Sequence, residues 1–203
     1  MDRLIELPAK SWIYQLDPIP AEIQLNEKEF DELWNFHPQE FAIVNVYGEK
    51  KTPRYQQSYG RNYSFSKTEH KALALTYPYL LRLMEWSSHN CKTKLSFDAN
   101  YDGCLVNWYE NGDHYIGPHS DSESDLVPNS PIYSFSFGQE RTFRVTKKEK
   151  ESFEFETFDI EMKNNSLLVM GGEMQKHFKH AVPKRSINSC PGKRINVTFR
   201  KFK

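Results

Sequence analysis

Residues 104–146 read CLVNWYENGDHYIGPHSDSESDLVPNSPIYSFSFGQERTFRVT. Aromatic and β-branched residues, which favour strands, are concentrated in three short segments of this stretch, at 104–109, 132–137 and 142–146. Turn signals such as Asn111-Gly112 and Gly138 separate them. The same pattern predicts further strands at 153–160, 166–170 and 194–200. Many short strands divided by turns are typical of a sandwich or jelly roll.

The N-terminal half has a different pattern. Apolar residues recur at helical spacing in 25–36 and again in 67–90, where Pro78 should interrupt the helix. Between these segments we expect a strand at 41–47 and a charged hairpin or loop at 48–59. The sequence contains neither an internal repeat nor a linker, so we expect an α+β fold that forms one domain over residues 1–203, with the helices in 1–94 and the jelly-roll core in 95–203.

Composition narrows the class of protein. A chain of 203 residues with 38% hydrophobic content can bury one core. Its formal net charge is zero, but from residue 141 onward 15 Lys and Arg stand against 7 Asp and Glu. This basic end would suit nucleic acid, although it could equally be a solvated face without a partner.

Cysteine usage and hydropathy indicate the compartment. Three widely spaced cysteines without a CxxC pair argue against a disulfide framework or a zinc ribbon, and favour a reducing interior. The first 20 residues lack a signal-peptide core, and no apolar run approaches about 18 residues. We therefore expect a soluble, intracellular protein that does not bind membranes.

The chemistry is suggested by His119 and Asp121, which are followed about 60 residues later by His177 and His180. Two imidazoles and one carboxylate on one face of Fe(II) leave adjacent positions open for a bidentate cosubstrate and O₂. On an extended segment, residues at i and i+2 point the same way. His-x-Asp is weak evidence alone, because in a chain with seven histidines such a pair arises by chance roughly one time in three.

The last predicted strand adds independent evidence. Its polar residues, Arg194, Asn196, Thr198 and Arg200, share one parity, and its apolar residues share the other. If the polar face is buried, its two arginines require carboxylate partners, which a dicarboxylate cosubstrate would supply. A strand that turns its arginines to solvent is the alternative. Asn107 shares a face with Tyr109 on an earlier strand.

Taken together, residues 104–143, 166–184 (SLLVMGGEMQKHFKHAVPK) and 194–200 (RINVTFR) resemble the AlkB family of 2-oxoglutarate oxygenases in order, spacing and residue type. The resemblance implies a double-stranded β-helix (jelly roll) core with N-terminal helices and a nucleotide-recognition lid. It implies Fe(II), 2-oxoglutarate and O₂ as cofactors, with iron bound by His119, Asp121 and His180 and not by His177. The implied 2-oxoglutarate site consists of Asn107, Tyr109, Arg194, Asn196, Thr198 and Arg200.

Residues 42–66 resemble the nucleotide-recognition segment of the family's duplex-repair branch. The resemblance assigns a finger that enters the base stack to Val46, Tyr47 and Gly48, and base contacts to Tyr63 and Phe65. Aromatic faces can hold an extruded base, although an aromatic pair at i and i+2 is also common in protein cores. Arg54 and other basic residues could contact the substrate or be ordinary surface charges, and Glu123 could hold a cationic base or be one more charge of an acidic loop.

The implied function is oxidative demethylation of 1-methyladenine and 3-methylcytosine in DNA, a direct-reversal repair that releases formaldehyde, succinate and CO₂. The expected partner is double-stranded DNA with a flipped alkylated base, bound by a monomer that would be nuclear in a eukaryotic cell. Two alternatives remain. One is an oxygenase that acts on methylated RNA or on a protein side chain, and the other is an inactive jelly roll that only binds nucleic acid.

Overall fold

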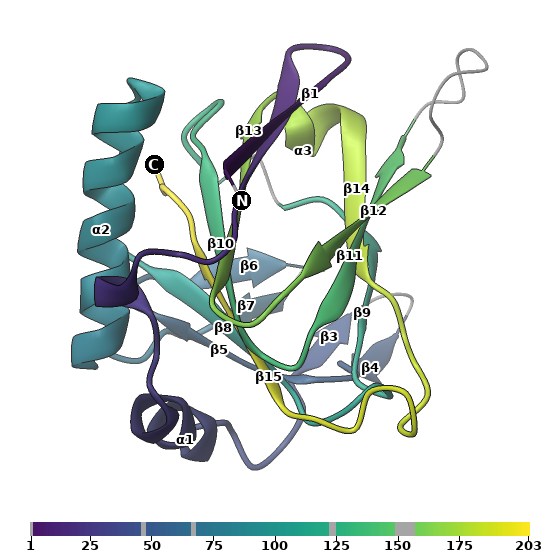
Figure 1. Cartoon of the computed structure of the whole chain (residues 1–203). Helices are drawn as coiled ribbons and strands as arrows, with labels where there is room; N and C mark the ends of the chain where they lie inside the picture. The colour runs from purple at the N-terminus through teal and green to yellow at the C-terminus, as the bar shows by residue number, and fades with distance from the viewer. Residues whose placement is uncertain (1, 46–47, 66–67, 122–124, 149–156) are drawn as a thin grey trace.

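The computed structural model describes residues 2–45, 48–65, 68–121, 125–148 and 157–203, and antiparallel sheets dominate it (Figure 1). The larger sheet has seven strands, in the order β1 (Asp2–Leu7), β2 (Ser11–Leu16), β13 (Ser166–Gly172), β10 (Ile132–Gly138), β15 (Arg194–Phe199), β8 (Cys104–Tyr109) and β5 (Tyr55–Tyr59). The smaller has four, in the order β12 (Thr157–Met162), β11 (Arg141–Lys147), β14 (Phe178–Val182) and β9 (Ile116–His119). Two hairpins stand apart, β3 (Ile43–Asn45) with β4 (Glu49–Lys51) and β6 (Tyr63–Phe65) with β7 (Thr68–His70). The described chain is thus mostly β.

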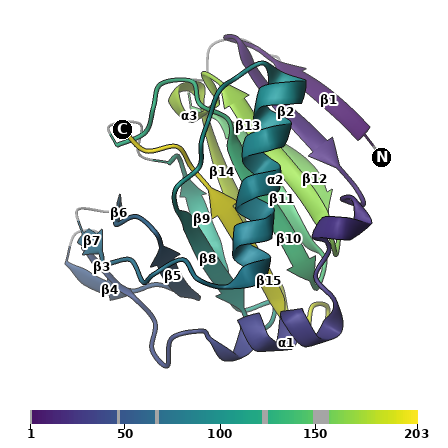
Figure 2. The ribbon, with the colours of Figure 1, turned by 90° about the vertical axis from the view of Figure 1, so that its left-hand side faces the viewer.

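Helices are few. They are α1 (Glu27–Asn35), α2 (Pro78–Leu95) and the short α3 (Met174–His177), with a 3-10 turn η1 at Ala21–Ile23. The helix predicted at 25–36 is confirmed as α1, and its start is fixed by a capping box between Asn26 and Glu29. Figure 2 shows α2 lying across one face of the seven-stranded sheet. Among the described residues, no helix is both long and apolar enough to span a membrane.

Two apolar cores define the layers. The first lies between the helices and the outer face of the seven-stranded sheet, and it includes Leu33 of α1, Leu80 of α2 and Trp108 of β8. The second lies between the two sheets, with Leu168 from the larger and Val145 from the smaller. The seven-stranded sheet therefore has its central strands buried on both faces, with helices on one side and the smaller sheet on the other.

Strand β15 occupies a central position in this arrangement, because it pairs with β10 on one edge and β8 on the other. All six of its residues are buried. Ile195, Val197 and Phe199 belong to the core under the helices, so Arg194, Asn196 and Thr198 face the space between the sheets. The alternative of a solvent-facing strand is excluded, and the cationic face is interior.

Two expectations for the N-terminal half were wrong. No helix extends through residues 68–77: residues 68–70 form β7, and α2 begins at Pro78. Proline fits the first turn of a helix but disfavours helical geometry in the preceding residue, and Tyr77 is extended with φ −72° and ψ 123°. The loop or hairpin expected at 48–59 contains β5, a full strand of the large sheet. The strand expected at 41–47 is the shorter β3.

In the C-terminal half, strands are found at all the predicted positions that the structure describes, as β8, β10, β11, β13 and β15. Of the strand predicted at 153–160, residues 153–156 lie outside the described residues, and β12 begins at Thr157. The first 94 residues contribute β1, β2 and β5 to the seven-stranded sheet in addition to the helices.

Candidate active site

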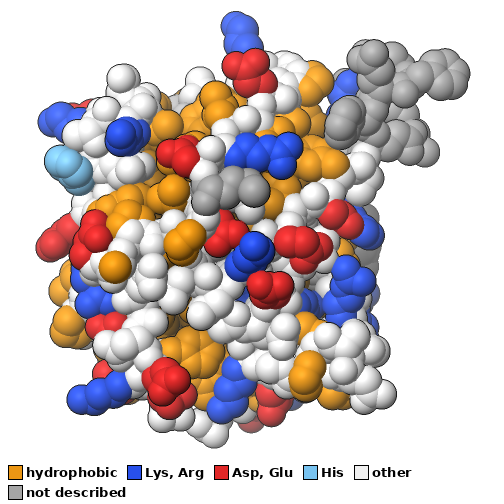
Figure 3. Space-filling model, in the orientation of Figure 1, with side chains coloured by type: hydrophobic (Ala, Val, Ile, Leu, Met, Phe, Trp, Pro, Cys, Tyr) orange, Lys and Arg blue, Asp and Glu red, His pale blue; other side chains and the backbone are white. Residues whose placement is uncertain are grey.

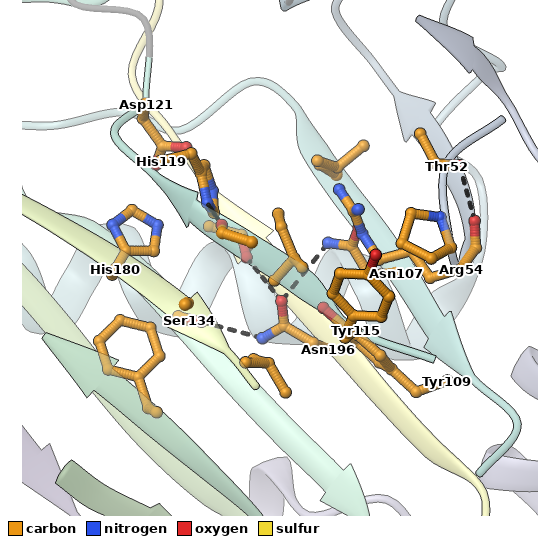
Figure 4. A pocket seen from close by; sticks show the side chains of 18 of the residues that line it. Thr52, Arg54, Asn107, Tyr109, Tyr115, His119, Asp121, Ser134, His180 and Asn196 are labelled. Carbon is orange, nitrogen blue, oxygen red and sulfur yellow. Dashed lines mark hydrogen bonds between the residues drawn. The ribbon is translucent and has the colours of Figure 1, made fainter. Parts of the chain in front are cut away.

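A cavity of about 750 Å³ lies between the two sheets (Figure 4). One wall is the polar face of β8 and β15, and the opposite wall includes β9, Phe143 of β11 and His180 of β14. Residues 50–54 contribute to its lining from β4 and the segment that follows. The cavity thus gathers residues from segments that are far apart in the sequence.

The three predicted iron ligands lie together in this cavity. His119 ends β9, and its register partner on β14 is His180, so strand pairing brings the two rings to a centroid separation of 4.2 Å. Asp121 follows two residues beyond the strand end. One ligand atom from each residue lies within 4.8 Å of the others, and no other cluster of this kind is found among the described residues. His177, which the family resemblance did not assign to the metal, bonds Glu173 at 2.9 Å.

Local contacts fix this loop after β9. The Ser120 hydroxyl donates to the carbonyl of Phe178 at 2.8 Å, which ties the loop to β14. The side-chain oxygen of Gln175, on α3, accepts from the Asp121 backbone N–H at 2.9 Å. Neither residue was predicted from the sequence, since a serine inside His-x-Asp and a glutamine before the distal histidine carry no signal without the fold.

Both imidazoles are neutral at neutral pH. Burial lowers the pKa of His180 to about 3, and proximity to His119 adds to this effect. Burial also lowers the pKa of His119. The Nδ1 atom of His119 donates to the carbonyl of Gly117 at 2.9 Å, which leaves Nε2 with a free lone pair. Neutral imidazoles are suitable metal ligands, and the bond to Gly117 fixes the tautomer of His119 for that role.

The carboxylate of Asp121 is held by Arg200. Nε and Nη2 of Arg200 donate to the two carboxylate oxygens at 3.0 and 2.9 Å, and both side chains are almost fully buried. Burial alone would raise the pKa of Asp121, but Arg200 and the two histidines keep it well below its usual range. Asp121 is therefore an anion. The Nε–Nη2 edge of the Arg200 guanidinium is thus already occupied by Asp121.

Arg194 differs from Arg200 in its hydrogen bonding. It is 2% exposed, its Nη2 donates to the Ser136 hydroxyl at 2.8 Å, and its guanidinium lies 5.0 Å from the ring centroid of Tyr109. Its Nε and Nη1 have no hydrogen-bond partner in the described part of the chain. Burial lowers its pKa from the usual value. A buried cation with unsatisfied N–H groups, facing a cavity, fits an incoming carboxylate.

Between the arginines, polar side chains form a connected row. Arg54 Nε donates to Oδ1 of Asn107 at 2.7 Å, and Nδ2 of Asn107 lies 3.5 Å from Oδ1 of Asn196. Asn196 in turn donates to Ser134, and its Oδ1 accepts from Thr198. All six residues predicted to bind 2-oxoglutarate line the cavity. Ser134 and Ser136 were missed, although IYSFSF places both serines on one parity, which was an available signal.

The predicted substrate residues are less completely described. Val46, Tyr47 and Glu123 lie outside the described residues. Gly48 begins the segment into β4 with φ +106°, which favours glycine. Tyr63 and Phe65 lie on β6, and only their backbone is described. Arg54 is 5% exposed and lines the cavity, so it is a cavity residue and not a surface charge.

The family follows from a comparison with known proteins. Residues 49–200 match the model of the 2OG-Fe(II) oxygenase superfamily, a span that contains the whole His119, Asp121 and His180 cluster. The curated relatives that match over most of the chain are AlkB homologues. The chain is an AlkB-family 2OG-Fe(II) oxygenase. Fe(II) and 2-oxoglutarate are the cofactors of this family.

Two AlkB relatives are called DNA oxidative demethylase ALKBH2. The mouse protein is 31% identical over 184 residues, which cover 86% of this chain and 73% of that protein. The human protein is 32% identical over 173 residues, 79% of this chain and 61% of its own length. Human alkB homolog 3, an α-ketoglutarate-dependent dioxygenase by name, is 35% identical over 105 residues, 49% of this chain and 36% of that protein.

Among solved structures, that of OsALKBH1 shares the fold of this AlkB protein. Its TM-score is 0.59 at 15% sequence identity, and the match covers 98% of this chain and 100% of that one. An identity this low speaks for the fold alone, and it agrees with the mostly antiparallel β architecture.

Proposed function

We propose that this AlkB-family protein demethylates N-alkylated nucleobases in DNA, chiefly 1-methyladenine and 3-methylcytosine, with release of formaldehyde, succinate and CO₂. The observation that carries the proposal is the His119–Asp121–His180 cluster, which shares one buried cavity with the unsatisfied guanidinium of Arg194. The cavity thus combines a set of metal ligands with a cation that can bind a carboxylate. The choice of DNA is supported by the ALKBH2 relatives, which are named DNA oxidative demethylases.

His119, Asp121 and His180 are the proposed iron ligands. Two neutral imidazoles and one carboxylate match the donor set of Fe(II) oxygenases. When bound, the iron and its cosubstrate supply the oxidation of the N-methyl C–H bond, after which the hydroxylated methyl group leaves as formaldehyde. Arg200 keeps Asp121 ionised and oriented, and Gln175 and Ser120 hold the loop that carries it.

Arg194 is the proposed partner of the 2-oxoglutarate carboxylate remote from the metal. Its free N–H groups and its burial favour a charge-assisted bond in a site of low dielectric. The remaining members of the proposed cosubstrate site are Asn107, Tyr109, Asn196, Thr198 and Arg200. Arg200 contributes indirectly, because it holds the carboxylate of Asp121 in place. The row of amides and hydroxyls shapes a polar wall that excludes apolar ligands.

The two facing sheets are interpreted as the double-stranded β-helix of the family, with the β3–β4 and β6–β7 hairpins as the nucleotide-recognition lid. Residues 46–48, the proposed finger, stand in the sequence between β3 and β4. Lys50 and Lys51 of β4 line the cavity. Figure 3 shows one face of the molecule, on which basic and acidic side chains are interspersed. We propose that the DNA strand lies against the two hairpins, next to Lys50 and Lys51, with Arg54, Tyr63, Phe65 and Glu123 as substrate contacts.

The proposed enzyme is a monomer that acts on duplex DNA, in the nucleus if the cell is eukaryotic. The test is incubation of the chain with Fe(II), 2-oxoglutarate and a duplex that carries a single 1-methyladenine. Formaldehyde and unmodified adenine should appear in equal amounts, and Asp121→Ala should produce neither. Methylated RNA and a protein extract serve as parallel substrates. Turnover confined to either of them would reject DNA as the substrate.

A further inference from the structure

A second cavity of about 290 Å³ adjoins the catalytic one, and Leu105 of β8 lines both. We call it the annex and define it by Gln56 and Ser58 of β5, Leu105 of β8 and His70 of β7. On β5, Gln56 and Ser58 share the face that carries the polar row of the active site, and Arg54 immediately precedes the strand. Gln56 is the register partner of Asn107, one strand further from the metal-ligand cluster than β8.

The annex contains buried polar atoms without partners. Gln56 is 5% exposed, and neither its amide nitrogen nor its amide oxygen has a hydrogen-bond partner in the described part of the chain. The hydroxyl of Ser58, a residue that is 1% exposed, also lacks one. By contrast, the neighbours Arg54 and Asn107 bond each other at 2.7 Å. The polar row is thus satisfied as far as Asn107 and unsatisfied at Gln56, which destabilises the fold unless a ligand or water completes it.

The annex interior carries no net charge. Burial, with help from Arg54, lowers the pKa of His70 below its ordinary value, so the ring is neutral at neutral pH. Of the charged residues that line the annex, Glu40 pairs with Lys51 at 3.5 Å and Lys71 is exposed. Neutral donors and acceptors dominate the lining, and Pro38, Ala42 and Leu105 form its apolar part. Such a mixed, uncharged interior suits a heteroaromatic ring and disfavours a phosphate or a carboxylate.

We propose that the annex is a second nucleobase subsite, which takes an undamaged base adjacent to the lesion in the strand under repair. The inference rests on the proposed function. A carboxamide presents a donor and an acceptor side by side, and this pair matches the hydrogen-bonding edge of a base, as in glutamine contacts to adenine. Ser58 offers a third contact. Because Leu105 borders both cavities, a base in the annex would lie next to the one in the catalytic cavity.

The experiment compares two strands that carry the same 1-methyladenine. In the reference strand both flanking nucleotides are normal. In the modified strand the flanking base on one side, tested separately at the 5′ and the 3′ position, is replaced by an abasic tetrahydrofuran residue. The wild-type kcat/KM should fall roughly 5- to 30-fold on one side, as expected for one or two neutral hydrogen bonds. Gln56→Leu should discriminate less than about twofold between the two strands. Fluorescence anisotropy with the same strands should show the same pattern in Kd.

Two further variants keep the test decisive. Ser58→Ala removes one hydroxyl and should reduce the discrimination in part, even if Gln56→Leu folds poorly. Gln24→Leu is the matched control, because Gln24 bonds the carbonyl of Ile19 at 2.8 Å and does not line either cavity; it should discriminate as the wild type does.

The outcomes separate the two proposals. If the wild type demethylates both strands equally, or if Gln56→Leu discriminates as strongly as the wild type, the annex holds only water and the inference is overturned while the proposed function stands. If no methylated base in any nucleic acid is turned over, both the proposed function and the proposed subsite are rejected.

Discussion

Replacing Arg194 with methionine should impair 2-oxoglutarate use without impairing iron binding. Arg194 lines the cavity, and two of its nitrogens, Nε and Nη1, have no hydrogen-bond partner among the described residues, while its Nη2 donates to Ser136. The side chains that it contacts, Ser136 and Tyr109, do not belong to the metal-ligand cluster. The substitution therefore removes the proposed hydrogen-bond donor to the cosubstrate carboxylate and leaves the iron ligands unchanged.

The magnitude follows from the type of bond. A charge-assisted hydrogen bond is worth about 1.5–3 kcal/mol, so the KM for 2-oxoglutarate should rise roughly 10- to 150-fold. Stability should not fall accordingly. Replacing a buried, incompletely bonded cation by an apolar side chain of similar length is often neutral or stabilising. We expect a Tm equal to or above that of the wild type.

Arg200→Met provides the comparison, because Arg200 is bonded to Asp121 through two nitrogens. Loss of a residue that orients a metal ligand typically weakens metal binding about 10- to 100-fold. The two variants should thus separate in two assays: succinate formation against 2-oxoglutarate concentration, and Fe(II) binding to the metal-free protein. An Arg194→Met protein with the wild-type KM would show that the cosubstrate carboxylate binds elsewhere, and the reasoning from unsatisfied N–H groups would fail.

Three further predictions concern the same site. His180→Ala should abolish Fe(II) binding, whereas His177→Ala should retain it. Titration of both metal-free variants with Fe(II) measures this, and the opposite result would show that the third ligand is His177. The pKa of His180 is about 3 in the folded protein and about 6.5 in the unfolded chain, so the unfolded chain binds the extra proton between these values. The free energy of unfolding of the metal-free protein should therefore fall by up to about 1.4 kcal/mol per pH unit for this group as the pH is lowered from 6.5 toward 3. Urea unfolding at several pH values measures that slope, and His180→Gln should flatten it; an unchanged slope would contradict the assignment. Finally, Tyr47→Ala should reduce demethylation of duplex DNA about 5- to 150-fold more than that of single strands, as expected for ~1–3 kcal/mol of lost stacking, and equal losses would remove the finger role.

The metal-ligand cluster could be predicted from the sequence because strand geometry is local. His119 and Asp121 stand two residues apart, and the resemblance to the family supplied His180 as the third ligand. The structure brings all three together through the pairing of β9 with β14. The contacts that hold them could not be predicted in the same way. Gln175 reaches Asp121 only because α3 folds back beside the loop, a relation that no spacing in the sequence encodes.

The strand β5 was missed at 48–59 for a reason that lies in the site itself. Residues 52–59 read TPRYQQSY, and their polarity predicts a loop when one face of each strand is assumed to be apolar and buried. In the structure, Tyr59 packs in the core under the helices, while Arg54 and Gln56 belong to the polar interior of the site. A strand that lines a ligand cavity lacks the apolar inward face by which strands are recognised. Its polarity was a sign of the site.

The same reasoning explains why the alternation in β15 was ambiguous. In a two-layer sandwich the apolar face of a strand points inward and the polar face outward, which would have placed Arg194 in solvent. The helices α1 and α2 change this outcome, because they cover the outer face of the large sheet and take its apolar residues. The polar face must then point between the sheets, where two buried guanidinium groups are tolerated only with anionic partners. Asp121 is one such partner and belongs to the protein. Arg194 has no such partner on its Nε and Nη1 among the described residues, so we expect its anion to come from outside, and a dicarboxylate cosubstrate would meet that requirement.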